Sequence, residues 1–201
     1  VHIFIPIMLA SLVGSLVTST VFDTSHNFEF FHKIELIPQH YIPLVVLAIF
    51  LGVLAAAFNK SLVSIIKHSA NIHIVPRLMI AALITGSLGY LIPGAMGTGT
   101  GAIDVSLANN WQVGLLVSLL LAKFLMTIFA LGLGIPGGII GPIIGIGAIA
   151  GALSGAFVMH IYPSEHIGSD FILMGMAGFM AASLNAPLAA LLAVVELSGQ
   201  L

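Results

Sequence analysis

Apolar residues along this chain fall into long runs separated by polar segments. The runs cover residues 2–22, 41–66, 78–92, 111–131, 139–161 and 171–197. Most hold about 20 residues, the length at which an α-helix crosses the roughly 30 Å hydrocarbon core of a bilayer. The pattern therefore predicts an all-α polytopic membrane protein.

The polar connections differ in charge, and this difference predicts an orientation. Residues 60–77 contain three of the five basic residues and no acidic residue, whereas residues 23–35 and 165–170 are net acidic. Basic connections are enriched on the cytoplasmic side of membranes. We therefore expect the connection at 67–77 to be cytoplasmic and the two acidic segments to lie outside.

The composition narrows the class of protein. Hydrophobic residues make up 59% of the 201 residues and charged residues only 6%, whereas soluble domains carry about 25% charged residues. The net charge of −2 gives no reason to expect a nucleic-acid partner. The chain has no cysteine, and its eight histidines lack metal-site spacing. We therefore expect no disulfide, no metal and no cofactor.

Two glycine-rich breaks, at residues 94–101 and 132–138, interrupt the apolar pattern. Unpaired backbone groups at membrane depth are tolerated only where they line a cavity or are buried in protein. The second break precedes a helix start at Gly138, with Pro142 in the first turn. Free N–H groups at such a start can bind an anion. The alternative is a packing break between close helices, and for residues 94–101 we expect only a turn or a re-entrant bend.

Three further features of the apolar runs carry predictions. Lys123 is a lone basic residue in a long run, which makes it a candidate functional residue. The alternatives are that it reaches toward an interface or pairs with a helix C-terminus. Small residues in 145–155 and 177–190 predict close helix packing. Asn185-Ala-Pro187 predicts a break in the last run.

Several of these segments resemble motifs of the CLC family of voltage-gated chloride channels and chloride/proton antiporters. Gly134-Ile-Pro-Gly-Gly-Ile-Ile-Gly-Pro142 resembles the GxFxP motif, with Ile140 where the family usually has Phe. Four further matches follow the family order: Phe58-Asn-Lys60, Pro93 with Gly97-Thr-Gly-Thr-Gly101, Lys123 where relatives carry Arg, and residues 175–188 with Glu196.

The resemblance implies a single transmembrane domain over residues 1–201, equivalent to family helices I to Q. The expected fold is the second half of an inverted repeat with tilted and broken helices. The family forms homodimers, here expected through residues 1–20 and 171–197, in contact with lipid of a plasma or inner membrane.

The resemblance also assigns roles to residues near the second break. The N–H groups of Ile139 and Ile140 would bind chloride, and the expected anion-binding set is completed by Gly138 and Gly141. The pore-supporting residues would be Lys123, Gly134, Pro136, Gly137 and Pro142. No residue is expected to be catalytic.

Two family motifs are absent from the chain. It has neither Gly-Lys-Glu-Gly-Pro nor Gly-Ser-Gly-Ile-Pro, since Leu133 replaces the serine at residues 132–136. We therefore expect a fragment of a longer protein that does not transport chloride alone, and the choice between channel and antiporter stays open. One alternative is an inverted-repeat carrier of another anion such as sulfate. An intramembrane enzyme is disfavoured, because the apolar runs lack paired carboxylates, a nucleophile–base pair and metal ligands.

Overall fold

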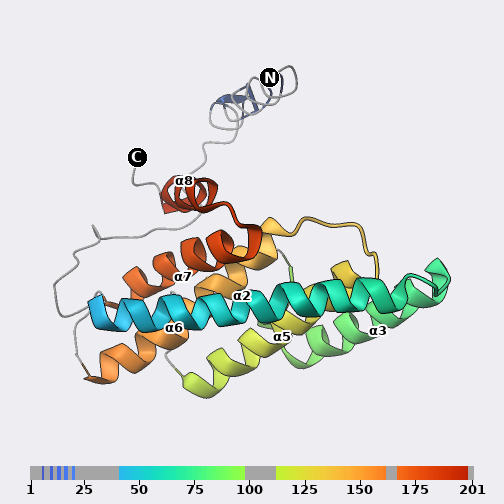
Figure 1. Cartoon of the computed structure of the whole chain (residues 1–201), viewed down its shortest axis with the longest axis horizontal. Coiled ribbons are helices and arrows are strands. Elements are labelled where there is room, and N and C mark those ends of the chain that lie inside the picture. Colours follow the sequence, from blue (N-terminus) through green and yellow to red (C-terminus); the bar gives the residue numbers. More distant parts are fainter. Residues whose placement is uncertain are drawn as a thin grey trace.

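The computed structural model describes residues 41–97, 112–161 and 167–198, together with seven helical positions before residue 21. For residues 167–169 and 196–198 it describes the backbone only. Every regular element in these residues is helical, which confirms the predicted all-α class. The elements in chain order are α2 (Tyr41–Ser69), α3 (Ile74–Leu91), the 3₁₀ turn η2 (Pro93–Ala95), α5 (Val113–Gly132), α6 (Ile140–Ile161), α7 (Ile167–Leu184) and α8 (Pro187–Ser198) (Figure 1).

Among the described residues, four helices are long and apolar enough to cross a membrane. These are α2, α3, α5 and α6, with 29, 18, 20 and 22 residues. At a rise of 1.5 Å per residue, 20 residues span about 30 Å. The runs predicted at 41–66, 111–131 and 139–161 are confirmed as helices with nearly the predicted bounds. The run at 2–22 lies largely outside the described residues.

The boundary between the second and third runs differs from the prediction. The expected connection at 67–77 is wrong, because α2 continues to Ser69 and α3 already begins at Ile74. Pro76 fits the first turn of α3, where its missing N–H is not needed. Lys67 and His68 fit the last turn of α2, where cations stabilise the helix C-terminus. Only residues 70–73 connect the two helices.

The tightest packing joins α6 and α7 through glycines. A Cβ atom added at Gly147 would lie 2.5 Å from the carbonyl oxygen of Gly175, so the two backbones touch. Gly151, one turn further along α6, meets the backbone of Phe171 in the same way. Small residues at a spacing of four allow such approach in membrane helices. The packing face predicted within 145–155 is confirmed.

Helix α2 runs along the bundle in contact with α5, α6 and α7 (Figure 1). Phe58, fully buried in α2, makes edge-to-face contacts with Phe124 and Phe179 at centroid distances of 5.6 and 5.8 Å. The Nδ2 of Asn59 donates to the carbonyl of Ser183 at 3.0 Å. Three helices distant in sequence therefore meet at one aromatic cluster.

The predicted break in the last run is also confirmed. Helix α7 ends at Leu184, and α8 begins at Pro187 and packs against α7. Between them Asn185 has a φ of 54°, a left-handed conformation that Asn tolerates better than most residues.

Candidate anion-binding site

Helix α5 ends in a turn that the sequence around Gly134 dictates. Gly134 has a φ of 93°, and its N–H donates to the carbonyl of Leu131 at 3.1 Å. The N–H of Ile135 donates to the carbonyl of Ala130 at 2.9 Å. This pair of bonds is the Schellman arrangement, in which glycine is preferred because it adopts positive φ without strain. Gly134 therefore stops α5 and turns the chain toward the second break.

Residues 135–138 have no regular structure, and α6 then begins at Ile140. The first backbone bond at this helix start runs from the N–H of Ile143 to the carbonyl of Ile139, at 3.1 Å. Pro142 has no N–H to satisfy. Within the described residues, no group accepts a hydrogen bond from the N–H groups of residues 137–141. This helix start therefore presents several free donors and the positive end of the helix dipole.

The space around these donors is open. Apart from the adjoining residues, no atom of the described part of the chain lies within 4 Å of the position that a Cβ would take at Gly137 or Gly138. Ile140 is 51% exposed, so its side chain does not cover the helix start. An anion can therefore approach the backbone at these two glycines without displacing a side chain of the described residues.

Lys123 lies in α5 and is only 2% exposed. Its Nζ donates to the carbonyl oxygens of Ala95, at 3.0 Å, and Gly97, at 2.6 Å. A buried ammonium group needs such partners, because desolvation without them is costly. The sequence allowed Lys123 to reach toward an interface or to pair with a helix C-terminus. The contact is of the second kind, because η2 ends at Ala95. The side chain ties the first glycine-rich break to α5.

One cavity of about 180 Å³ brings several of the predicted residues together. Its walls come from α3, η2 and α5, and they include Lys123. Gly137, Gly138 and Pro142 line it on the side of α6. The remaining predicted residues lie on the same segment without lining this cavity: Gly134, Pro136, Ile139, Ile140 and Gly141. A buried cation and a helix start with free donors therefore border one space.

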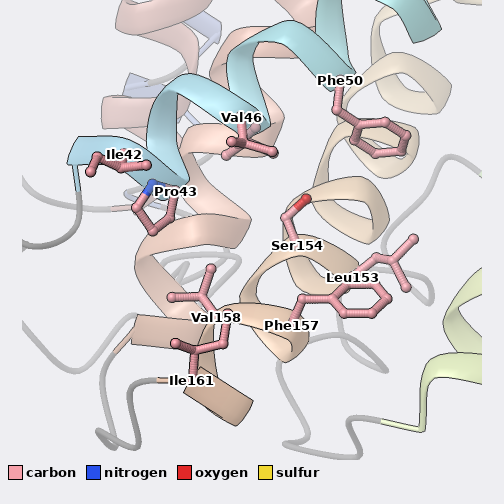
Figure 2. Close-up of a pocket in the computed structure, with 10 residues that line it drawn as sticks. Ile42, Pro43, Val46, Phe50, Leu153, Ser154, Phe157, Val158 and Ile161 are labelled. Atoms are coloured by element: carbon pink, nitrogen blue, oxygen red, sulfur yellow. The ribbon is translucent and has the colours of Figure 1, made fainter.

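A second cavity, of about 540 Å³, lies between the first turns of α2 and the last turns of α6 (Figure 2). Its lining is apolar except for Ser154. The Oγ of Ser154 donates to the carbonyl of Ala150 at 3.0 Å, so this hydroxyl is already occupied. The side chains of this lining therefore offer an anion no free donor and no charge, and the smaller cavity, which Lys123 borders, is the better candidate.

Sequence reasoning missed two polar side chains at the end of α5. The Oγ of Ser69, at the end of α2, donates to the carbonyl of Gly132 at 3.2 Å. Arg77, in the first turns of α3, lies against Gly134: a Cβ there would be 3.2 Å from its Nη2. No motif marks either residue. The one available signal was their place in the basic, acid-free segment 60–77.

Four helices of the described residues are long and apolar enough to cross a membrane, which indicates a multi-pass integral membrane protein, and a glycine-proline break before a helix start is typical of channels and transporters. Over residues 1–201 the chain matches the family model described as voltage gated chloride channel, and it belongs to that family. The match confirms the resemblance seen in the motifs and supports a chloride channel or transporter as the general kind of function. The roles of single residues, the homodimer and the lipid contacts stay predictions.

Proposed function

We propose that this chain contributes to a chloride pathway in which the start of α6 binds the anion through backbone N–H groups. The donors are those of Ile139 and Ile140, with Gly138 and Gly141 flanking them. The observation that carries the proposal is the set of unpaired N–H groups at residues 137–141. These groups lie at the positive end of a 22-residue helix, and Gly137 and Gly138 among them border the cavity of about 180 Å³.

The strength of such a site suits transport. Partial charges on N–H groups attract an anion strongly enough for it to enter and weakly enough for it to leave. Lys123 would add the field of a full charge without becoming a tight ligand, because two carbonyl oxygens already hold its Nζ. Pro136 and Gly137 carry the chain from the end of α5 to the donors.

Amide-to-ester replacement tests the backbone donors directly. In the full-length protein, an α-hydroxy analogue at Ile140 deletes one N–H group and keeps the side chain. Hydrogen bonds to charged groups contribute about 1.5–3 kcal/mol, so we expect chloride affinity to fall by roughly tenfold or more. Chloride efflux from liposomes, measured against chloride concentration, provides the readout.

Leu188 supplies a matched control for this replacement. It is the second residue of α8, whose first backbone bond is donated by Ala190 to the carbonyl of Ala186, so its N–H is also a free helix-start donor. The ester at Leu188 should leave efflux unchanged. Equal losses at both positions, or no loss at Ile140, would reject the proposed site. External pH recorded in the same runs separates an antiporter, which moves protons oppositely, from a channel.

A further inference from the structure

Arg77 is a half-buried cation without a partner in the described part of the chain. Its Nε is buried and makes no hydrogen bond. No described residue forms a hydrogen bond or an ion pair with any other atom of its guanidinium group. Leaving a buried donor unpaired costs free energy. The arrangement is understandable if a mobile anion supplies the missing acceptor.

The position of Arg77 relates it to the pathway. Its Nη2 lies beside Gly134, at the turn that leads through Ile135 and Pro136 to the start of α6. The bond from Ser69 to the carbonyl of Gly132 fixes the end of α2 at the same turn. The break that carries the proposed chloride donors therefore opens beside the basic end of α2.

Arg77 is not needed to cap α5. The last four carbonyls of that helix, at residues 129–132, each already accept one hydrogen bond. Three of the donors are the N–H groups of residues 133–135, and the fourth is the Oγ of Ser69. A cation near a helix C-terminus is favourable, which explains why Arg77 tolerates this place. The donors of its guanidinium group remain free for another acceptor.

The surroundings of Arg77 are cationic as well. The sequence has no acidic residue between Glu35 and Asp104. On α2, the exposed Lys60 and Lys67 line a surface hollow of about 490 Å³. No described residue forms an ion pair with either lysine. This end of the molecule therefore carries positive charge that attracts anions.

We infer that Arg77 is an outer anion-binding residue at the mouth of the chloride pathway. It binds a small monovalent anion transiently and raises its concentration beside the second break, on the side of the membrane where Lys60 and Lys67 lie. The inference rests on the proposed function, because an anion held at Arg77 contributes to transport only if the α6 start binds chloride. The ligand chemistry is that of chloride or bromide, which a guanidinium group can bind by charge and by two N–H groups.

The size of the effect follows from electrostatics. A unit charge about 10 Å away in water changes the local concentration of a monovalent anion by about twofold, and more where protein excludes water. The Debye length is about 10 Å at 0.1 M salt and about 3 Å at 1 M. The contribution of Arg77 to flux should therefore be large in dilute salt and nearly absent in concentrated salt.

Flux through the full-length protein in planar bilayers tests this dependence. We expect Arg77→Gln to lower chloride flux entering from the Arg77 side about two- to fivefold at roughly 0.05 M salt. At about 1 M salt the variant should match the parent. Arg77→Lys should keep most of the flux. Lys33→Gln, which removes the same charge from a segment expected on the opposite side, is the matched control.

A loss of flux that is equal in dilute and concentrated salt would overturn the inference, because it would indicate a packing role. An equal loss in Lys33→Gln would do the same. Bromide binding decides the question without transport: crystals of the full-length protein in bromide should show anomalous density beside Arg77, absent in Arg77→Gln. No density beside Arg77 rejects the inference, even if chloride flux through the α6 start is normal. Density without any chloride flux would reject the proposed function alone.

Discussion

At the scale of single residues, the two carbonyl partners of Lys123 make it a structural link. We predict that Lys123→Met lowers the free energy of unfolding by about 1–3 kcal/mol, because the buried carbonyl of Ala95 and the part-buried carbonyl of Gly97 lose their donor. The measurement is the unfolding temperature of the full-length protein in detergent. Lys123→Arg should recover part of the loss, since a guanidinium group offers several donors.

Lys67→Met is the control for the removal of a lysine charge. Lys67 is exposed near the end of α2 and has no hydrogen-bond partner among the described residues. Its replacement should leave the unfolding temperature unchanged. An unchanged temperature in Lys123→Met as well would show that the two carbonyl contacts contribute little.

The candidate site illustrates which residues sequence reasoning can find. Gly137, Gly138 and Pro142 stood out because glycine and proline at membrane depth are costly unless the backbone is used. The structure brings them to one cavity with Lys123. Arg77 was invisible, because its importance comes from a contact with Gly134, 57 positions away in the numbering. Neither spacing nor periodicity encodes such a contact.

At the scale of elements, the packing of α6 against α7 depends on the absence of side chains. We predict that Gly147→Ala destabilises the full-length protein by about 1–3 kcal/mol. The new Cβ would lie 2.5 Å from the carbonyl oxygen of Gly175, and that atom belongs to the backbone and cannot rotate away. Unfolding temperature and the fraction surviving heating on size-exclusion chromatography measure the effect.

Gly52→Ala is the matched control, because Gly52 lies inside α2 and, its own helix turn aside, no described residue comes within 4 Å of its added Cβ. Alanine favours the helix over glycine by up to about 1 kcal/mol, so this variant should be neutral or slightly more stable. Equal destabilisation in both variants would mean that the close approach of α6 and α7 is not what Gly147 provides.

Helix existence was predictable at this scale, whereas helix ends were less so. Long apolar runs predicted α2, α5 and α6 because burial in lipid leaves little else for such sequences to form. The start of α3 was missed because Arg77 and Pro76 resemble loop residues by type. Proline is compatible with a first helical turn, and a long basic side chain can lie over the neighbouring turn.

At the scale of the whole molecule, contacts between helices show which helix ends lie together at each end of the bundle. The beginning of α2 and the end of α6 meet at the apolar cavity, where Ile42 and Ile161 are among the lining residues. The end of α2 and the end of α5 meet at the bond between Ser69 and Gly132. The α6 start, Arg77 and the basic face of α2 therefore belong to one end of the bundle. On the proposed pathway, an anion entering from that end would meet cationic side chains before it meets backbone donors.

This arrangement predicts which positions are accessible from each side of the membrane. The 201 residues contain no cysteine, so a single cysteine introduced here is a unique label once any cysteine elsewhere in the full-length protein has been replaced. Tyr41→Cys and Lys67→Cys lie near opposite ends of α2 and should react with a membrane-impermeant thiol reagent from opposite sides. His160→Cys, at the end of α6, should react from the same side as Tyr41→Cys.

The basic segment 60–77 further predicts that Lys67→Cys reacts from the cytoplasmic side. Labelling of all three positions from one side would show that α2 does not cross the bilayer, and the arrangement of the pathway would have to be redrawn. Labelling from opposite sides, with Lys67→Cys labelled from outside, would keep the arrangement of the helices but reverse their orientation in the membrane. Arg77 and the α6 start would then receive anions from outside the cell, so the same three variants also decide the side from which the Arg77 flux experiment must supply chloride.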